Sequence, residues 1–363
     1  MLTKYIDTDN SFYEMFDRYT GLYIRSGIME DGKDTGVDPF MRSFPSLIDV
    51  GVMGHCAHGM SGYCQKSGTQ CYQNGLSTVR DNMSLENFCR IVDQCRGRVF
   101  QLALGGRGDV DQHENCENLL AYSRDNGIMP KFTTSGFGLT HRIVDMLKEY
   151  VGAVAISWYR ADYTHRSIKM LIGVGVKTSI HYVLGKNTID EAIERLANDS
   201  FPEGINAVIF LLHKPKGMGT IDNILKSSDE RAQRFFELVD NKRHPFKVGF
   251  DSCSCAGIVN FTESIDLDSI DYCEGARYSC YIDAQMKMMP CSFAADADEW
   301  LVCLNKHSIE EAWNSSVFDK FRSYLAGSCI TCNHRQCCGG GCPLFPDITL
   351  CARAERRTVV KST

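Results

Sequence analysis

The segment LIDVGVMGHCAHGMSGYCQKSGTQCYQNG, residues 47–75, joins a short apolar run to a loop that carries three cysteines. Apolar runs of this length are typical of strands that are buried on both faces of a parallel sheet. Cys56, Cys64 and Cys71 follow the run, and a second group of cysteines fills the last quarter of the 363-residue chain. Thiolates gathered in this way bind metals or form disulfides, and the compartment of the protein decides between the two.

The composition favours metal. The N-terminal residues MLTKYIDTDNSF lack the basic and apolar stretches of a secretory signal. No apolar run approaches the ~18 residues that span a membrane. We therefore expect a cytoplasmic protein without a membrane partner, in a reducing compartment where clustered cysteines bind metals more often than they form disulfides. The formal net charge of -6 argues against a nucleic-acid partner, which requires a basic face.

Five further runs of strand length follow the first: VFQLAL (99–104), MPKFTT (129–134), AVAIS (153–157), VKTSIHYV (176–183) and NAVIFLL (206–212). Segments with helical spacing separate the runs, and Thr188 and Glu191 predict a capping box before one of these helices. Six strand–helix units predict parallel strands with right-handed crossovers. We therefore predict an α/β fold, a partial (β/α)6 barrel of the TIM type, with its chemistry at the carboxyl ends of the strands.

The alternation divides the chain into four predicted parts. Residues 1–46 are a mixed, polar N-terminal extension, in which 27–39 has the composition of a loop. Residues 47–250 form the barrel. Residues 251–351 form a small domain rich in Gly, Cys and Asp. We expect bound ligands, and not a large apolar core, to hold this domain together. Residues 352–363 form an exposed C-terminal tail.

Two motifs at strand ends carry the predicted chemistry. Cys56, Cys64 and Cys71 would leave one iron of a 4Fe–4S cluster without a protein ligand, and that iron could bind a substrate or cofactor. A zinc knuckle that uses His55 or His58 as the fourth ligand is the alternative. Gly105–Gly106 ends the second predicted strand, where glycines allow a bound group to approach the backbone. A simple turn is the alternative there.

These residues resemble the radical S-adenosylmethionine superfamily, in which three cysteines are often followed by a tyrosine. Cys71-Tyr72-Gln73 resembles the end of that motif, although the spacings of seven and six residues between the cysteines are wider than usual. Gly105 and Gly106 resemble the glycine pair that meets the methionyl amine. The acid that normally follows this pair is replaced by Arg107, which leaves the amine to Asp109 or another group.

The same resemblance extends to later strand ends. It implies that Ser157 and His181, at the ends of the fourth and fifth predicted strands, face the nucleoside. Ordinary polar groups at strand ends are the alternative for both. The catalytic residues of the substrate reaction stay unknown at this point.

The C-terminal cysteines resemble the SPASM extension of radical S-adenosylmethionine enzymes, which binds two auxiliary iron–sulfur clusters. Carried over by position, Cys273, Cys291 and Cys342 would bind the first auxiliary cluster, with Cys253, Cys255 or Cys280 as a possible fourth ligand and Cys253 favoured. The second cluster would be bound by Cys329, Cys332, Cys338 and Cys351. Met286 occupies the place of a glycine in this pattern. Cys337 competes with Cys338, and a zinc ribbon would need a second CxxC pair that the pattern lacks.

The resemblance implies S-adenosylmethionine and three 4Fe–4S clusters as cofactors. Reductive cleavage of S-adenosylmethionine would release a 5′-deoxyadenosyl radical, which abstracts hydrogen from a substrate. Because members with this extension mostly modify peptides or proteins, the leading hypothesis is an oxidoreductase that matures a peptide by forming a thioether or carbon–carbon crosslink. The alternatives are a radical enzyme that acts on an amino acid or sugar, and a non-catalytic, metal-stabilised electron-transfer or binding protein.

The implied partners are a peptide or protein substrate and an electron donor such as flavodoxin or ferredoxin. A separate leader-binding protein is a further candidate, because the residues before 47 are too few for the recognition domain with which many peptide-modifying relatives begin. Sulfatase-maturating relatives carry an acidic base where this chain has Ser292, which argues against that activity.

Overall fold

The structure is a computed structural model that describes residues 2–62, 64, 68, 70–75, 79–295 and 297–351. The predicted tail, 352–363, lies outside the described residues. The chain divides into two compact units: the first comprises Met1–Thr69, Gln73–Thr178 and Gly275–Arg322, and the second comprises Gln70–Tyr72, Ser179–Glu274 and Ser323–Thr363. The domain bounds proposed from the sequence stay a prediction.

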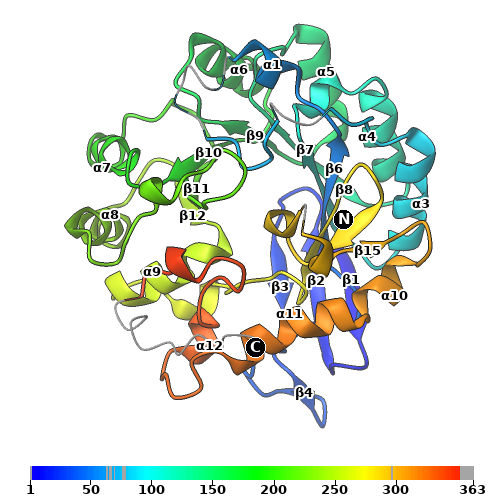
Figure 1. The fold of residues 1–363 in the computed structure, drawn as a ribbon, viewed down its shortest axis with the longest axis vertical. Helices are drawn as coiled ribbons and strands as arrows, with labels where there is room; N and C mark the ends of the chain where they lie inside the picture. The colour runs from blue at the N-terminus through cyan, green and yellow to red at the C-terminus, as the bar shows by residue number, and fades with distance from the viewer. Residues whose placement is uncertain are drawn as a thin grey trace. The chain divides into compact units, whose positions relative to one another are not determined.

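The first unit is built on four parallel strands. In sheet order these are β6 (Leu47–Met53), β7 (Gln101–Gly106), β8 (Met129–Thr134) and β9 (Val154–Ser157). Each is followed by a helix that Figure 1 shows on the outer side of the strands: α3 (Leu85–Cys95), α4 (Cys116–Asp125), α5 (His141–Tyr150) and α6 (Asp162–Gly173). The apolar residues of these helices face the strands because both elements must bury an apolar face.

The sheet of the first unit continues past β6 with residues from much later in the sequence. Strand β13 (Ser279–Ile282) pairs with β6 in parallel, and β14 (Lys287–Met289) and β15 (Val302–Cys303) follow in antiparallel order. Helix α10 (Ile309–Trp313) begins with a capping box at Ser308, and α11 (Ser316–Gly327) comes next in the chain.

The second unit contains three parallel strands, β10 (Thr178–Leu184), β11 (Ala207–Leu212) and β12 (Lys247–Phe250). The helices α7 (Ile189–Asn198) and α8 (Glu230–Asn241) follow β10 and β11, and Figure 1 shows them beside these strands. Two shorter helices, α9 (Cys255–Phe261) and α12 (Arg335–Cys338), carry cysteines. No helix among the described residues is long and apolar enough to cross a membrane.

The predicted alternation is confirmed, with two corrections of detail. All six predicted runs contain a strand, but β12 is a seventh parallel strand that the sequence reasoning missed, because its four residues include a lysine and a glycine. The capping box at Thr188 does not form: its hydroxyl donates to the Val183 and Gly185 carbonyls, which is a turn interaction that competes with helix capping.

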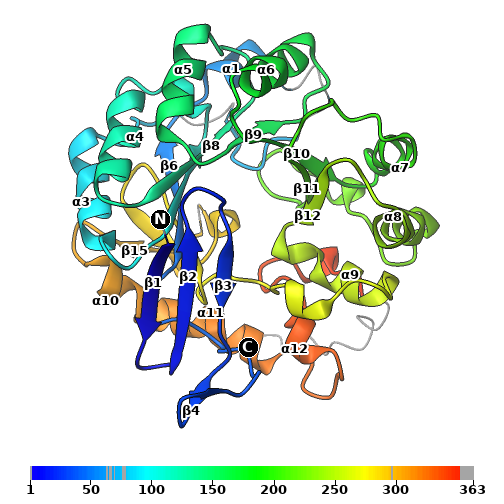
Figure 2. The ribbon, with the colours of Figure 1, turned by 180° about the vertical axis from the view of Figure 1, so that it is seen from behind.

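Residues 2–46 form regular structure within the first unit. They form an antiparallel sheet of β1 (Leu2–Asp7), β2 (Phe12–Asp17) and β3 (Tyr23–Arg25), shown in Figure 2. The segment predicted as a loop contains a hairpin, β4 (Met29–Glu30) and β5 (Lys33–Asp34), whose turn residues have the positive φ angles that close such hairpins. Phe16 of β2 stacks on Phe100, with 5.7 Å between ring centroids.

A buried ion pair joins this N-terminal sheet to the chain that leads into the barrel strands. Arg42 Nε lies 3.0 Å from Glu14 Oε2, and both side chains are fully buried. The Arg42 guanidinium also donates to the Arg98 carbonyl at 2.6 Å and lies over the Tyr5 ring. Burial raises the pKa of Glu14, and the Arg42 charge opposes that rise. Each charge of the pair is therefore the main compensation for burying the other.

We expect Glu14→Ala to destabilise the protein by about 3–5 kcal/mol, because it leaves the Arg42 charge buried without its carboxylate. The free energy of unfolding, measured in urea, checks this expectation. Glu299→Gln is the matched control: it removes an exposed carboxylate 2.9 Å from Lys320, and we expect a change below about 1 kcal/mol. Equal effects of the two substitutions would contradict the role given to the buried pair.

Candidate functional site

The loop after β6 begins with a cysteine that caps a short helix. Cys56 is the N-cap of α1 (Ala57–Ser61), and its Sγ accepts a hydrogen bond from Gly59 N at 3.1 Å. Cys64 is 8% exposed. Both belong to the first unit, whereas Cys71 belongs to the second, where its carbonyl accepts from Met218 N at 2.9 Å. The structure thus places two of the three predicted ligands in one unit.

Glycines allow the backbone to pack closely around Cys56. A Cβ atom on Gly75 would lie 2.9 Å from the Cys56 Cβ, and one on Gly108 would lie 2.6 Å from the His55 carbonyl oxygen. Distances this short exclude any side chain unless the backbone moves. The end of the cysteine loop and the loop after β7 therefore meet at Cys56 through positions that only glycine can occupy without displacement.

The two glycines that end β7 have different surroundings. A Cβ on Gly105 would meet no atom within 4 Å, whereas Gly106 has φ +119° and its Cβ would lie 2.7 Å from the Met53 carbonyl oxygen. Gly106 is therefore required by the local backbone. Gly105 borders open space, so the backbone there is accessible to a bound group.

Arg107, which replaces the acid expected after the glycine pair, has a structural partner. Its backbone N–H donates to the Met53 carbonyl at 3.0 Å, and its buried guanidinium donates to the Gln73 carbonyl at 3.0 Å. The side chain therefore ties the end of the cysteine loop to the ends of β6 and β7. The sequence reasoning identified the missing acid but not this tie, because a carbonyl acceptor leaves no trace in side-chain composition.

Two carboxylates follow Arg107. Asp109 accepts a hydrogen bond from Ser135 N at 2.8 Å, and its Oδ2 lies 3.0 Å from His58 Nε2. Interaction with this carboxylate raises the pKa of His58. Burial raises the pKa of Asp111, whose carboxylate accepts from the Thr134 hydroxyl at 2.7 Å. Asp109 thus joins the loop after β7 to the end of β8 and to the helix that follows Cys56.

The two histidines of the zinc-knuckle alternative both contact other groups. His58 faces Asp109 and makes an edge contact with the Phe137 ring, with 4.6 Å between centroids. The His55 Nδ1 atom lies 3.2 Å from the Arg80 carbonyl oxygen. Within the described ranges, no group of three His, Cys, Asp or Glu side chains is close enough to hold one metal ion.

The remaining predicted cofactor residues lie in both units. Ser157 is the last residue of β9 and is partly exposed in the first unit. His181 lies in the middle of β10, and Tyr72, which is 36% exposed, belongs to the same second unit. The nucleoside contacts of Ser157 and His181, and the cofactor contact of Tyr72, stay predictions.

The second unit brings several cysteines together. The Cys253 and Cys342 thiols contact each other, and their hydrogen bond is the leading cause of the raised pKa of Cys253. Cys255 donates to the Asp271 carbonyl at 3.0 Å, and the neighbouring Cys338 helps to raise its pKa after burial. Helix α9 packs against α12, which explains why Cys255 and Cys338, far apart in the chain, become neighbours.

The candidates for the fourth ligand are therefore in different surroundings. Cys253 lies against Cys342, a predicted ligand of the first auxiliary cluster, and Cys255 lies near Cys338, a predicted ligand of the second. Cys280 is only 2% exposed within β13 of the first unit, where burial raises its pKa and Cys95 is a neighbour. These positions favour Cys253 over Cys280.

Tight turns shape the remaining C-terminal cysteine loop. Cys329 has a positive φ of 52°, and its carbonyl accepts from Cys332 N at 2.9 Å. Helix α12 ends at Cys338, and Gly339, Gly340 and Gly341 continue with positive φ to Cys342. Cys273 and Cys351 are partly buried in the same unit.

Cys291 lies in the first unit, at the start of a short 3-10 turn (Ser292–Ala294). Upstream, Met286 occupies the place where the SPASM pattern has a glycine. Its φ is +60°, in the left-handed region that favours glycine, and its side chain is 1% exposed. Burial of the methionine side chain offsets the cost of the left-handed conformation.

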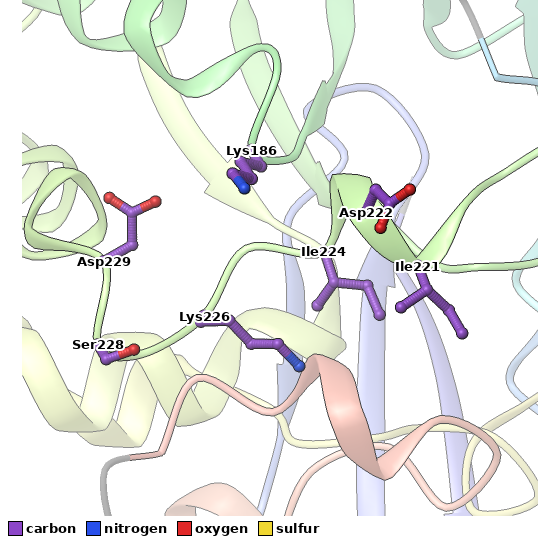
Figure 3. A pocket seen from close by; sticks show the side chains of 7 residues that line it. All are labelled: Lys186, Ile221, Asp222, Ile224, Lys226, Ser228 and Asp229. Carbon is purple, nitrogen blue, oxygen red and sulfur yellow. The ribbon is translucent and has the colours of Figure 1, made fainter.

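A pocket of about 340 Å³ lies in the second unit and is open to the surface. Figure 3 shows its lining residues: Lys186, Ile221, Asp222, Ile224, Lys226, Ser228 and Asp229. None of the cofactor or metal residues predicted from the sequence is among them. The pocket therefore adds a surface feature that the motifs did not indicate.

Comparisons with known proteins give a consistent picture. No protein-family model matches the chain. The chain is 25% identical to the mycofactocin maturase MftC of Mycobacterium tuberculosis (strain ATCC 25618 / H37Rv) over 305 residues, which cover 77% of this chain and 75% of that protein. It is 22% identical over 301 residues to MftC of Mycolicibacterium smegmatis, with the same coverage of 77% and 75%.

Solved structures share the fold. SuiB of Streptococcus suis bound to its precursor peptide SuiA matches with a TM-score of 0.70 at 12% identity, covering 97% of this chain and 98% of that chain. Native anSMEcpe with bound AdoMet matches with a TM-score of 0.58 at 16% identity, covering 84% of this chain and 91% of that chain. The findings support a radical S-adenosylmethionine enzyme with a SPASM-type domain. The resemblance seen in the sequence and the predicted α/β barrel class are thereby confirmed.

An acidic residue precedes the cysteine loop in the strand that leads into it. Ile48, Val50 and Val52 of β6 are fully buried on one face of the strand, and Asp49 lies on the other face. Asp49 is in register with Ala103 of β7 and, one strand further, Lys131 of β8. Burial raises the pKa of Asp49 to about 6, and the Lys131 charge opposes that rise.

We expect Asp49→Asn to stabilise the protein at pH 7 by on the order of 1–2 kcal/mol. This is less than the whole pKa shift would give at ~1.4 kcal/mol for each pKa unit. Because folding raises the pKa of Asp49, the stabilising effect of the protonated carboxyl is complete below its ordinary pKa. It is lost as the pH rises through about 6. The asparagine mimics the protonated form, so the gain in unfolding free energy should disappear near pH 4.

Urea unfolding between pH 4 and pH 7.5 measures this difference. Asp31→Asn, the same change at an exposed turn residue, is the control for the substitution itself. Parallel profiles for the wild type and Asp49→Asn would show that the carboxyl has the same pKa in the folded and unfolded states.

Proposed function

We propose that this protein is a radical S-adenosylmethionine peptide maturase of the reducing cytoplasm. The observation that carries the proposal is the similarity to mycofactocin maturase, which covers 77% of the chain. The folds of SuiB bound to its precursor peptide SuiA and of anSMEcpe bound to AdoMet and the Cp18Cys peptide add support, with TM-scores of 0.70 and 0.59. The reaction proposed is formation of a thioether or carbon–carbon crosslink in a peptide.

The residues present suit S-adenosylmethionine and a 4Fe–4S cluster at the carboxyl end of β6. Cys56, Cys64 and Cys71 would hold the cluster. When both are bound, S-adenosylmethionine and the cluster would supply a 5′-deoxyadenosyl radical that can take a hydrogen atom from an unactivated carbon. Gly105 leaves the backbone open to a bound group, which agrees with its proposed place beside the methionyl part. Ser157 and His181 are proposed to face the nucleoside, and Tyr72 to flank the cluster.

The chain's own side chains have positioning roles in this proposal. Arg107 holds the end of the cysteine loop through the Gln73 carbonyl, and Asp109 orients His58 and Ser135 around the same loop. Asp109 and Asp111 are the carboxylates that follow the open glycine, and they are the proposed replacements for the acid absent at Arg107. Buried hydrogen bonds of this kind keep the loop in one conformation and exclude water from it.

The C-terminal thiols are proposed to hold two auxiliary 4Fe–4S clusters. Cys253, Cys273, Cys291 and Cys342 would bind the first, and the contact between Cys253 and Cys342 supports two of these ligands. The second would be bound by Cys329, Cys332, Cys338 and Cys351. The proposed role of the auxiliary clusters is to accept the electron left after substrate oxidation. An electron donor such as flavodoxin or ferredoxin would reduce the cluster held by Cys56, Cys64 and Cys71.

Release of 5′-deoxyadenosine tests the function. We expect the anaerobically reconstituted, reduced protein to form 5′-deoxyadenosine from S-adenosylmethionine, and Cys64→Ala to abolish that product by removing one ligand of the first cluster. Cys332→Ala should lower iron content and yield while some cleavage survives. Chromatography of the nucleoside products measures the yield of each protein, and iron analysis measures the iron content. Normal cleavage by Cys64→Ala would contradict the ligand assignment.

The peptide substrate needs a separate measurement. Candidate peptides encoded by short reading frames beside the gene would be synthesised with deuterium at cysteine, serine and aromatic positions. Transfer of deuterium into 5′-deoxyadenosine would identify the abstracted hydrogen. Transfer from labelled amino acids or sugars, with none from peptides, would instead favour the small-molecule alternative. A copurifying small protein that binds such a peptide would identify the proposed leader-binding partner.

Gly105 and Gly106 give a matched pair for the cofactor site. We expect Gly105→Ala to keep the stability and iron content of the wild type but to weaken S-adenosylmethionine binding at least several-fold, because the added methyl group occupies space that is now open. Gly106→Ala should lower stability by about 1 kcal/mol or more, because φ +119° strains any other residue. Equilibrium dialysis and urea unfolding measure the two effects. Unchanged binding by Gly105→Ala would remove Gly105 from the site.

A further inference from the structure

A buried ion pair lies at the carboxyl ends of β11 and β12. Lys214 is 4% exposed, and its Nζ lies 2.6 Å from Asp251 Oδ2. The ammonium also donates to the Leu212 carbonyl at 2.9 Å. A buried ion pair adds little net stability compared with apolar residues, so its presence suggests a role other than stability.

Asp251 connects this pair to a cysteine. It precedes the 3-10 turn Ser252–Ser254, and its Oδ1 atom accepts from the Ser254 hydroxyl at 2.9 Å. Its Oδ2 atom also accepts from Leu212 N at 3.2 Å. The carboxylate is therefore held between the end of β11 and the turn that carries Cys253.

The same turn brings the ion pair close to two thiols. Cys253 contacts Cys342, and both thiols act electrostatically on the Lys214 ammonium. All four groups belong to the second unit. One positive and one negative side chain thus lie beside two of the four residues proposed to bind the first auxiliary cluster.

We propose that the Lys214 ammonium and the Asp251 carboxylate shift, in opposite directions, the reduction potential of the auxiliary cluster assigned to Cys253 and Cys342. The inference rests on the proposed function, which assigns that cluster. Reduction by the electron left after substrate oxidation adds one negative charge to this cluster, without forming or breaking a bond in it. In a poorly solvated site, a nearby cation favours the reduced cluster and a nearby anion disfavours it. The pair balances the two effects and holds both charges in place.

The balance predicts opposite shifts from the two single substitutions. Lys214→Met leaves the Asp251 carboxylate alone and should lower the midpoint potential of this cluster. Asp251→Asn leaves the ammonium alone and should raise it. The double variant, with neither charge, should return toward the wild-type value. A purely structural role would instead impair cluster retention in every variant without a shift that depends on the sign of the charge.

The experiment is a potentiometric titration of each reconstituted full-length variant, followed by electron paramagnetic resonance and by iron analysis. Lys216→Met is the control: it removes a partly exposed lysine from the same loop, and solvent should screen its effect on the potential. If Lys214→Met fails to retain the cluster, Asp251→Asn and the double variant still decide. Shifts of the same sign, no shift, or loss of the cluster in all three variants would overturn the inference.

A second pair of variants separates this inference from the function on which it rests. Cys253→Ala and Cys342→Ala should each lose the same spectral signal that the charge variants shift. If both retain every cluster signal and the full iron content, the proposed ligands are wrong. If both lose the signal while Lys214→Met and Asp251→Asn leave its potential unchanged, the ligands stand and the role of the ion pair fails.

Discussion

Close backbone contact around Cys56 is the constraint on which the candidate site of the first unit depends. The loop after β7 and the end of the cysteine loop approach Cys56 at Gly108 and Gly75, where a Cβ atom would collide with backbone or with the cysteine itself. Buried polar groups then hold the approach, because Arg107 satisfies the Gln73 carbonyl and Asp109 satisfies Ser135 N. A loop without regular hydrogen bonding needs such partners to keep one conformation.

The N-terminal sheet of the first unit also contains a buried polar group that depends on a buried partner. Phe12 and Phe16 lie on one face of β2 and are each 2% exposed, so this strand contributes to the core. The Glu14 carboxylate lies on the same face and would be unfavourable there without Arg42. The opening residues are thus a necessary part of the first unit, although their composition is mixed.

The second unit uses short helices and glycines to gather thiols. Helix α9 places Cys255 at its first turn, and a Cβ on Gly257 in the same helix would lie 2.6 Å from the Phe236 ring. The run Gly339–Gly341 turns the chain between Cys338 and Cys342 with φ values that other residues rarely adopt. Bound clusters would add cohesion to the cysteine-bearing loops of this unit, since metal binding contributes to folding free energy.

The sequence by itself determined the α/β alternation, because short apolar runs and helical stripes differ in period, and it determined the two groups of cysteines. It also indicated the glycine pair after the second strand and the acid missing at Arg107. Only the tertiary structure decided that Arg107 bonds a carbonyl, that Lys214 is buried against Asp251, and that Cys253 lies against Cys342. These outcomes depend on contacts between residues far apart in the chain, and local propensity carries no information about such contacts.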